Sequence, residues 1–200
     1  MNLPVLLLLT LNFAVIGLLP KLFFRSDGRL NLRWWLTALP FWASPLLLLV
    51  AAVTDLRPLT PRAWDDGLSF ASVVVSVGSL AVLFLTLGTH RIPISLWHQD
   101  DDAPQHLVTW GPYRFVRHPF YASFLLAFLA AFVYFPHWGT FVSLAYGLVA
   151  LNLTGAREER RLSASEFGAE YRRYLARTGR FVPRIGRTRP TAGAHPASSS

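Results

Sequence analysis

Long apolar runs constrain the fold of this chain more than any other feature of its sequence. Five of them recur, at residues 3–19, 34–53, 67–87, 120–135 and 138–153. Most approach the roughly 17 to 25 residues that a helix needs to cross a bilayer, although the fourth is short. Of the 200 residues, 52% are hydrophobic and only 15% are charged. The sequence therefore predicts an all-α integral membrane protein with about five transmembrane helices.

The flanks of the first apolar run distinguish it from a secretory signal peptide. The opening residues, MNLPVLLLLT, carry no basic group ahead of the apolar stretch, and no small-residue cleavage site precedes Pro20 and Lys21. We therefore expect this run to remain in the protein as a transmembrane helix.

Basic residues concentrate in alternate connections between the apolar runs. Four lie after the first run, at positions 21, 25, 29 and 33, and ten arginines follow the fifth run, between positions 157 and 189. The turn FPHW, between the fourth and fifth runs, has no lysine or arginine. Because these residues favour cytoplasmic connections, we expect the amino terminus outside and the carboxyl terminus in the cytoplasm. The short chain, without eukaryotic sorting signals, favours a bacterial inner membrane.

The net charge of +8 fits this topology. Arginines that flank membrane spans contact anionic headgroups, so we expect membrane lipids as partners and no nucleic acid. The chain has no cysteine, which excludes disulfides and cysteine metal sites. Its histidines show neither HxxxH nor HExxH spacing, and neither GxGxxG nor a Walker motif occurs. We therefore expect no metal site and no conventional nucleotide cradle.

The composition divides the chain into three parts. Residues 1–88 hold the first three apolar runs, with ionisable groups near the run ends, and predict a membrane scaffold. Residues 89–185 hold a connection of some thirty residues, the last two runs and a basic amphipathic segment, and predict the functional region. Residues 186–200 are rich in proline, serine and alanine, which predicts a disordered tail.

The segment after the fifth run predicts a helix that lies at the cytoplasmic interface of the membrane. Its apolar residues fall at the spacing of one helical face, and arginines surround that face. The apolar residues are Leu162, Phe167, Tyr171, Tyr174 and Leu175.

The stretch GPYRFVRHPFYAS, which opens the fourth run, allows two interpretations. Pro119 suits the first turn of a helix and places His118 at its amino-terminal end, where unpaired N–H groups suit an anionic ligand. Arg117 can add a bidentate contact to a carboxylate. Alternatively, the arginines reach lipid headgroups, and Tyr113 and Tyr121 form an aromatic belt at the membrane interface. The segment alone does not decide between a ligand site and a membrane anchor.

Two adjacent carboxylates, Glu158 and Glu159, follow the fifth run. Neighbours lie about 100° apart around a helix, so the two do not share a face. Glu158 has Arg161 three residues later as an ion-pair partner, whereas Glu159 has no basic residue at that spacing. We therefore expect Glu159 to be the freer of the two to face a site. The alternative is a solvated, salt-bridged helix.

Three blocks of the carboxyl-terminal half carry a resemblance: HLVTWGPYRFVRHPFY, EERRLSASEFGAEYRRYL and FVPR, with a membrane hairpin between the first two. This pattern, over residues 105–184, resembles the isoprenylcysteine carboxyl methyltransferase family and related membrane phospholipid methyltransferases. The resemblance implies that the last helices and the cytoplasmic loops bind S-adenosylmethionine. It also implies a lipophilic acceptor, a prenylcysteine-like carboxylate or a lipid headgroup, that enters from the bilayer.

The resemblance implies roles for individual residues as well. Arg117, Glu158 and Glu159 would take part in catalysis, and Glu159 would also contact the cofactor. This chain departs from the family pattern at Thr154, where an arginine that engages the acceptor is usual. The other residues expected to line the cofactor are Gln105, His106, Leu107, Val108, Tyr113 and His118.

Two other functions remain open at the level of the sequence. Membrane sterol reductases share part of the carboxyl-terminal pattern and use NADPH, and a non-catalytic membrane protein can retain the fold. Cofactor binding separates the three, because a methyltransferase binds S-adenosylmethionine, a reductase binds NADPH, and a scaffold turns over neither.

Overall fold

The protein is helical throughout the part of the chain that the structure describes. The structure is a computed structural model that describes residues 2–19, 29–54, 56–89 and 107–184. Within these ranges it contains helices and no strand, which confirms the all-α prediction. The cofactor candidates Gln105 and His106 and the predicted tail, residues 186–200, lie outside the described residues.

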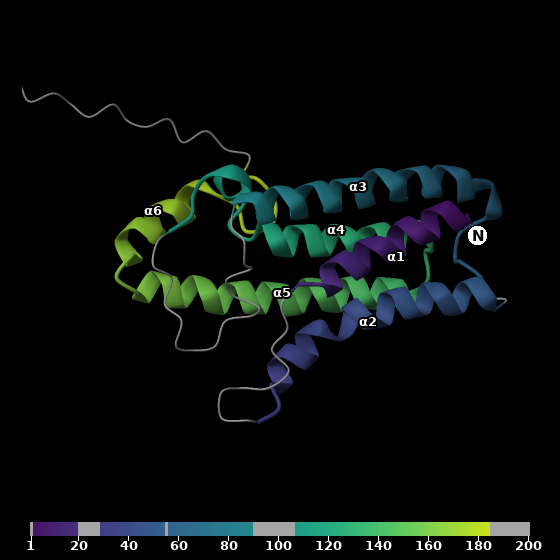
Figure 1. The fold of residues 1–200 in the computed structure, drawn as a ribbon, viewed down its shortest axis with the longest axis horizontal. Helices are drawn as coiled ribbons and strands as arrows, with labels where there is room; N and C mark the ends of the chain where they lie inside the picture. Colours follow the sequence, from purple (N-terminus) through teal and green to yellow (C-terminus); the bar gives the residue numbers. More distant parts are fainter. Residues whose placement is uncertain (1, 20–28, 55, 90–106, 185–200) are drawn as a thin grey trace, which may run out of the picture.

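Five helices lie side by side in the body of the protein, and a shorter sixth helix lies at one end (Figure 1). Two 3₁₀ turns, Arg62–Trp64 and Gly111–Arg114, precede the third and fourth helices. The helices are α1 Leu3–Gly17, α2 Leu32–Val53, α3 Asp65–Thr89, α4 Pro119–Tyr134, α5 Trp138–Ala164 and α6 Gly168–Arg177.

Helices α1 to α5 correspond in order to the five predicted spans. Helix α2, the continuous segment Arg62–Thr89 and helix α5 are long and apolar enough to cross a membrane. Helices α1 and α4 are apolar but shorter, with 15 and 16 residues. Together with the family assignment given below, these helices make the chain an all-α integral membrane protein.

Helix α4 is the centre of the bundle. It contacts α1, α2, α3 and α5, and its packing against α3 is the most extensive in the bundle. Phe124 and Phe128, one turn apart, are almost completely buried, and Phe41 from α2 packs against both rings. Gly147 of α5 lets Phe128 approach, because a Cβ there would lie 2.9 Å from the ring. Because α4 is enclosed by other helices, little of it is left to face lipid.

Small polar side chains join α3 to its neighbours. The hydroxyl of Ser79 donates to the Ser123 carbonyl of α4 at 2.8 Å and contacts the Asn12 side-chain oxygen of α1 at 3.2 Å. Asn12 also donates to the Ser76 hydroxyl at 3.0 Å. All of these groups are fully buried. Small residues let membrane helices approach closely, and the hydrogen bonds satisfy polar groups that lipid cannot solvate.

Helix α5 is longer than the sequence suggested. It ends at Ala164 instead of the predicted Leu153, because the charged residues that follow the apolar run are good helix formers. The chain then turns at Ser165, whose hydroxyl donates to the Leu162 carbonyl at 2.8 Å. Helix α6 begins at Gly168, where a Cβ would lie 2.4 Å from the Ser163 carbonyl oxygen.

The predicted amphipathic helix is therefore divided between two elements. Leu162 belongs to α5 and Phe167 to the turn, whereas Tyr171, Tyr174 and Leu175 lie on α6. Tyr171 is buried, and the Tyr174 hydroxyl donates to the Tyr113 carbonyl at 2.6 Å. The two tyrosines of α6 thus pack toward the loop before α4.

The segment after α6 pairs with the loop before α4 through backbone hydrogen bonds. Val116 and Gly179 form an isolated parallel bridge. The Arg117 N–H donates to the Gly179 carbonyl at 2.9 Å, and the His118 N–H donates to the Arg180 carbonyl at 3.1 Å. These bonds bring two segments some sixty residues apart in sequence into contact at the start of α4 (Figure 1).

Replacement of Gly179 by alanine should disrupt this pairing. A Cβ at Gly179 would lie 1.8 Å from the Val182 carbonyl oxygen, which is backbone and cannot rotate away. We expect Gly179→Ala to lower the free energy of unfolding by at least the roughly 1–3 kcal/mol that overpacking usually costs. Thermal unfolding of the purified protein in lipid measures the loss. Gly78→Ala is the matched control, because a Cβ there meets nothing within 4 Å. Equal stability of both variants would contradict the prediction.

Candidate functional site

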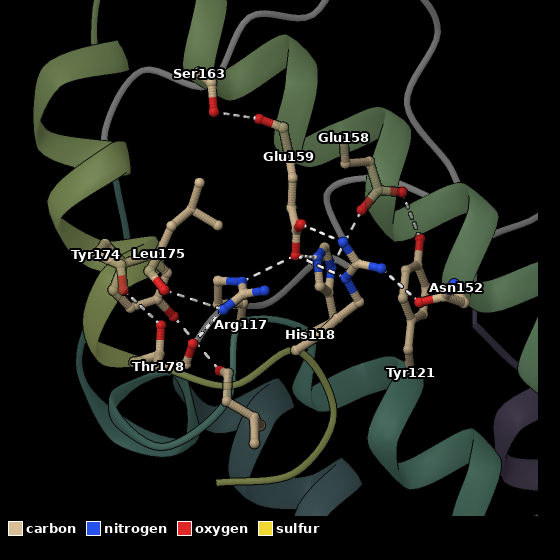
Figure 2. A network of polar contacts seen from close by, with 12 residues as sticks. Arg117, His118, Tyr121, Asn152, Glu158, Glu159, Ser163, Tyr174, Leu175 and Thr178 are labelled. Carbon is tan, nitrogen blue, oxygen red and sulfur yellow. Dashed lines mark hydrogen bonds and ion pairs between the residues drawn. The ribbon is translucent and has the colours of Figure 1, made fainter. Parts of the chain in front are cut away.

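A group of charged side chains lies where the loop before α4, helix α5 and the segment after α6 meet (Figure 2). Both glutamates predicted from the sequence belong to it, as do two residues of the RHP motif. A second arginine joins them from beyond α6. We call this group the charged cluster: Arg117, His118, Glu158, Glu159 and Arg180.

Glu159 has the most ionic partners in the cluster. Its Oε1 accepts from Arg117 Nε at 2.9 Å and from Arg180 Nε at 3.0 Å, and it lies 3.3 Å from His118 Nε2. Its Oε2 accepts from Arg180 Nη2 at 2.5 Å. The glutamate is buried, with 8% of its surface exposed. A buried carboxylate needs such partners, since an unpaired charge away from water is costly.

The prediction that Glu159 would be the freer carboxylate is therefore wrong. The prediction considered only ion-pair partners on the same helix, whereas Arg117 and Arg180, which pair with Glu159, lie outside α5. The expectation that the two glutamates face apart also needs correction. The imidazole of His118 lies between them, with Nδ1 3.3 Å from Glu158 Oε2 and Nε2 3.3 Å from Glu159 Oε1.

Arg117 connects the cluster to the end of α6. Besides Glu159, its guanidinium donates to the carbonyls of Leu175, at 3.4 Å, and Thr178. Both carbonyls lie at the carboxyl-terminal end of α6, where the helix leaves its last acceptors without partners and where a cation is favourable. Arg117 therefore holds the loop, α5 and α6 together.

Glu158 contacts α4 instead of a guanidinium. The Tyr121 hydroxyl donates to Glu158 Oε1 at 2.6 Å. Tyr121 is 1% exposed, and its ring stacks on the His118 imidazole with 5.2 Å between centroids and 7° between planes. The alternative that Tyr121 and Tyr113 form an interfacial belt is thus excluded, because both side chains are buried inside the protein.

His118 is the N-cap residue of α4, as Pro119 predicted. Burial alone would lower the pKa of its imidazole. The hydrogen bonds and charges of Glu158 and Glu159 raise this pKa by more than burial lowers it, so the pKa lies above its ordinary value. Gly155 makes room for the ring, since a Cβ there would lie 3.2 Å from Nε2. The site therefore favours an imidazolium held between two carboxylates.

The remaining predicted residues lie around the loop. Tyr113 is buried in the second 3₁₀ turn, and burial raises the pKa of its phenol. Val108 is buried and Leu107 partly buried, at the start of the described loop. Gly111, between Val108 and Tyr113, allows the chain to turn, because its φ is 60° and the side chain of Thr89 leaves no room for a Cβ there. The structure thus describes Leu107, Val108 and Tyr113 but not Gln105 or His106.

Sequence reasoning missed three residues of the site. Arg180 forms an ion pair with Glu159 and also donates to the side-chain oxygen of Asn152 on α5. Phe181 lies with its ring centroid 6.2 Å from that of His118. Arg180 follows a helix whose end the sequence did not locate, so no local pattern marked it, whereas Phe181 opens the quoted FVPR block and only its role was missed. Tyr121 belonged to the quoted motif, and only its role was missed.

Protonation of His118 should make stability depend on pH. Its pKa is higher in the folded protein than the roughly 6.5 of an unfolded chain, so its contribution is complete below about pH 6.5 and is lost as pH rises through the folded value. We expect the unfolding temperature of the wild type to fall over this range, and that of His118→Gln to fall less. Parallel pH dependences of the two proteins would contradict this. Thermal unfolding at constant ionic strength between pH 6 and pH 9 provides the comparison.

Comparison with known proteins assigns the family. The profile of the family described as phospholipid methyltransferase matches residues 74–170, a span that includes α4, α5 and both glutamates. Methanethiol S-methyltransferase 2 of Bradyrhizobium diazoefficiens is 30% identical over 178 residues, which cover 80% of this chain and 67% of that protein. Methanethiol S-methyltransferase 1 of the same bacterium is 31% identical over 139 residues, 64% of this chain and 47% of that protein. No solved structure matches significantly. The chain is a membrane methyltransferase that belongs to the phospholipid methyltransferase family.

Proposed function

We propose that the protein transfers the methyl group of S-adenosylmethionine to a small lipophilic thiol. The observation that carries the proposal is the charged cluster, in which two carboxylates and three cationic groups meet beside the start of α4 (Figure 2). We further propose that this end of the bundle faces the cytoplasm of a bacterial cell, as the distribution of arginines indicates.

The side chains of the site suit the chemical groups of this cofactor. Its carboxylate needs donors, and the candidates are Arg180, a partly exposed member of the cluster, and the exposed Asn152 beside it. Its ammonium needs an acceptor, for which Glu159, the glutamate that the resemblance assigns to the cofactor, offers Oε2 with a single cationic partner. Its adenine needs an apolar wall, for which Phe181 and Val108 are candidates, and the resemblance adds Gln105 and His106. When bound, the cofactor supplies a methyl group on a cationic sulfur.

The charge of the cluster favours an anionic nucleophile. Arg117, Arg180 and the imidazolium of His118 outnumber the two glutamates, so the residual charge of the cluster is positive. A positive environment stabilises a thiolate or a carboxylate and disfavours a protonated lipid amine. The two relatives with methanethiol S-methyltransferase names support a thiol. A prenylcysteine-like carboxylate and a lipid headgroup remain the alternative acceptors.

The protein contributes mainly position and exclusion of water. Methyl transfer is an in-line displacement, and holding two reactants in line can supply about 7–11 kcal/mol of rate acceleration. Arg117, His118 and Arg180 are fixed by several contacts each, so their donors are preorganised. The buried ring of Tyr121 and the partly buried ring of Phe181 pack against each other and against His118, which limits the access of water to this part of the cluster.

Transfer of a labelled methyl group tests the proposal. The protein in lipid nanodiscs is given methyl-labelled S-adenosylmethionine with hexanethiol, with a prenylcysteine analogue or with phosphatidylethanolamine. We expect label in the hexyl methyl thioether, because the positive cluster stabilises the thiolate. Labelling of the other acceptors alone would overturn the thiol assignment. An absence of both transfer and cofactor binding would overturn the whole proposal, and NADPH binding would favour the reductase alternative.

Variants of the cluster should lose cofactor affinity. We expect His118→Ala and Glu159→Ala each to weaken binding of S-adenosylmethionine by on the order of tenfold, the equivalent of about 1.4 kcal/mol. Arg172→Ala is the control, because Arg172 is exposed and its guanidinium donates to the Ser163 carbonyl outside the cluster. Isothermal titration in detergent measures the affinities. Equal losses in all three variants would indicate general destabilisation and contradict a role at the site.

A further inference from the structure

The two glutamates of the cluster differ in how much of their capacity to accept protons and hydrogen bonds is used. A carboxylate has about four lone-pair positions. Glu159 accepts from both guanidiniums and lies beside the imidazole, and Oε1 alone is within reach of three nitrogens. Three cations around one carboxylate leave little affinity for a further proton. Glu159 is thereby committed to holding the segments together.

Glu158 has fewer cationic partners than Glu159. One of its oxygens accepts from the neutral phenol of Tyr121, and the other faces the imidazole that it shares with Glu159. Neither guanidinium of the cluster forms an ion pair with it in the described structure. Its side chain keeps 14% of its surface exposed. Glu158 therefore retains lone pairs and an approach for another group.

Tyr121 fixes the position of Glu158. The phenol lies in the first turn of α4, is 1% exposed and stacks on His118. The rings of Phe124 and Phe181 lie at 6.2 Å and 6.4 Å from its own. These ring contacts hold the phenol in place, and its hydroxyl donates to Glu158 Oε1 at 2.6 Å. Figure 2 shows the hydroxyl of Tyr121 directed at Glu158.

We propose that Glu158 is the proton acceptor of the transfer reaction and that Tyr121 is its positioning residue. This inference rests on the proposed function, because it requires a thiol acceptor. The Glu158 carboxylate takes the proton from the S–H group as the sulfur forms its bond to the methyl carbon. The bond between that carbon and the sulfonium sulfur breaks, its electron pair stays on the donor sulfur, and the proton leaves Glu158 for solvent.

The replacement of Tyr121 by phenylalanine tests the positioning role. We expect Tyr121→Phe to lower kcat for hexanethiol about tenfold or more, while Kd for S-adenosylmethionine changes less than about twofold. Tyr134→Phe is the matched control. Tyr134 lies at the other end of α4, and its hydroxyl likewise donates one hydrogen bond, to the Asn2 carbonyl at 2.8 Å. Unchanged kcat in Tyr121→Phe, or an equal loss in Tyr134→Phe, would overturn the inference.

An acidic thiol separates proton transfer from a structural defect. A thiophenol that is already ionised at the pH of the assay has no proton to give, so it should be methylated by Glu158→Gln and by Tyr121→Phe at nearly the wild-type rate. Hexanethiol has a pKa above the roughly 8.5 of a cysteine thiol and keeps its proton, so both variants should methylate it more slowly than the wild type does. Equal losses with both thiols would overturn the inference.

A double variant tests whether Tyr121 acts through Glu158. If it does, Tyr121→Phe combined with Glu158→Gln is no slower with hexanethiol than Glu158→Gln alone. Multiplied losses would overturn the positioning role. The wild type is measured first in every series: a wild type without thiol methylation refutes the proposed function, whereas thiol methylation that does not respond to these variants refutes only this inference.

Discussion

The buried ion pairs of Glu159 hold the functional end of the molecule together. One carboxylate on α5 receives Arg117 from the loop before α4 and Arg180 from the segment after α6. Removing one partner of such a buried pair generally costs about 3–5 kcal/mol, because the other charge is left without compensation. Together with the backbone bonds between the loop and the segment after α6, this side chain fixes three segments that are distant in the sequence, and the position of His118 depends on both.

The apolar bundle and the charged cluster occupy different parts of the protein and are stabilised by different interactions. Within the bundle, α4 is enclosed by its neighbours, and the few polar groups, such as Asn12 and Ser79, satisfy one another. Charges concentrate where α5 continues past the start of α4 (Figure 1). A site at this boundary suits the proposed function, in which a lipophilic acceptor would come from the bilayer and a charged cofactor from water.

The sequence predicted the helices well and the site in part. The apolar runs predicted both ends of each helix from α1 to α4 to within about two residues, because lipid restricts the length and the composition of a helix that crosses it. The end of α5 was missed, since hydropathy stops where the charges begin and the helix does not. Arg117, His118 and both glutamates were found from their motifs. Arg180 was not, because its place depends on the turn at Ser165 and on a backbone bridge to Val116.

The relation between the two glutamates shows why spacing alone could not assign their roles. Local pairing rules treat Glu158 and Glu159 as competitors for arginines on their own helix. In the folded chain their partners come from other segments: guanidiniums for Glu159, a phenol for Glu158, and one imidazole between them. The imidazole of His118 lies between both carboxylates, so that the strongly paired Glu159 holds it in place, while our proposal assigns the proton of the reaction to Glu158. Adjacent residues of the same type can therefore divide stability and chemistry between them, and tertiary contacts determine which residue takes which role.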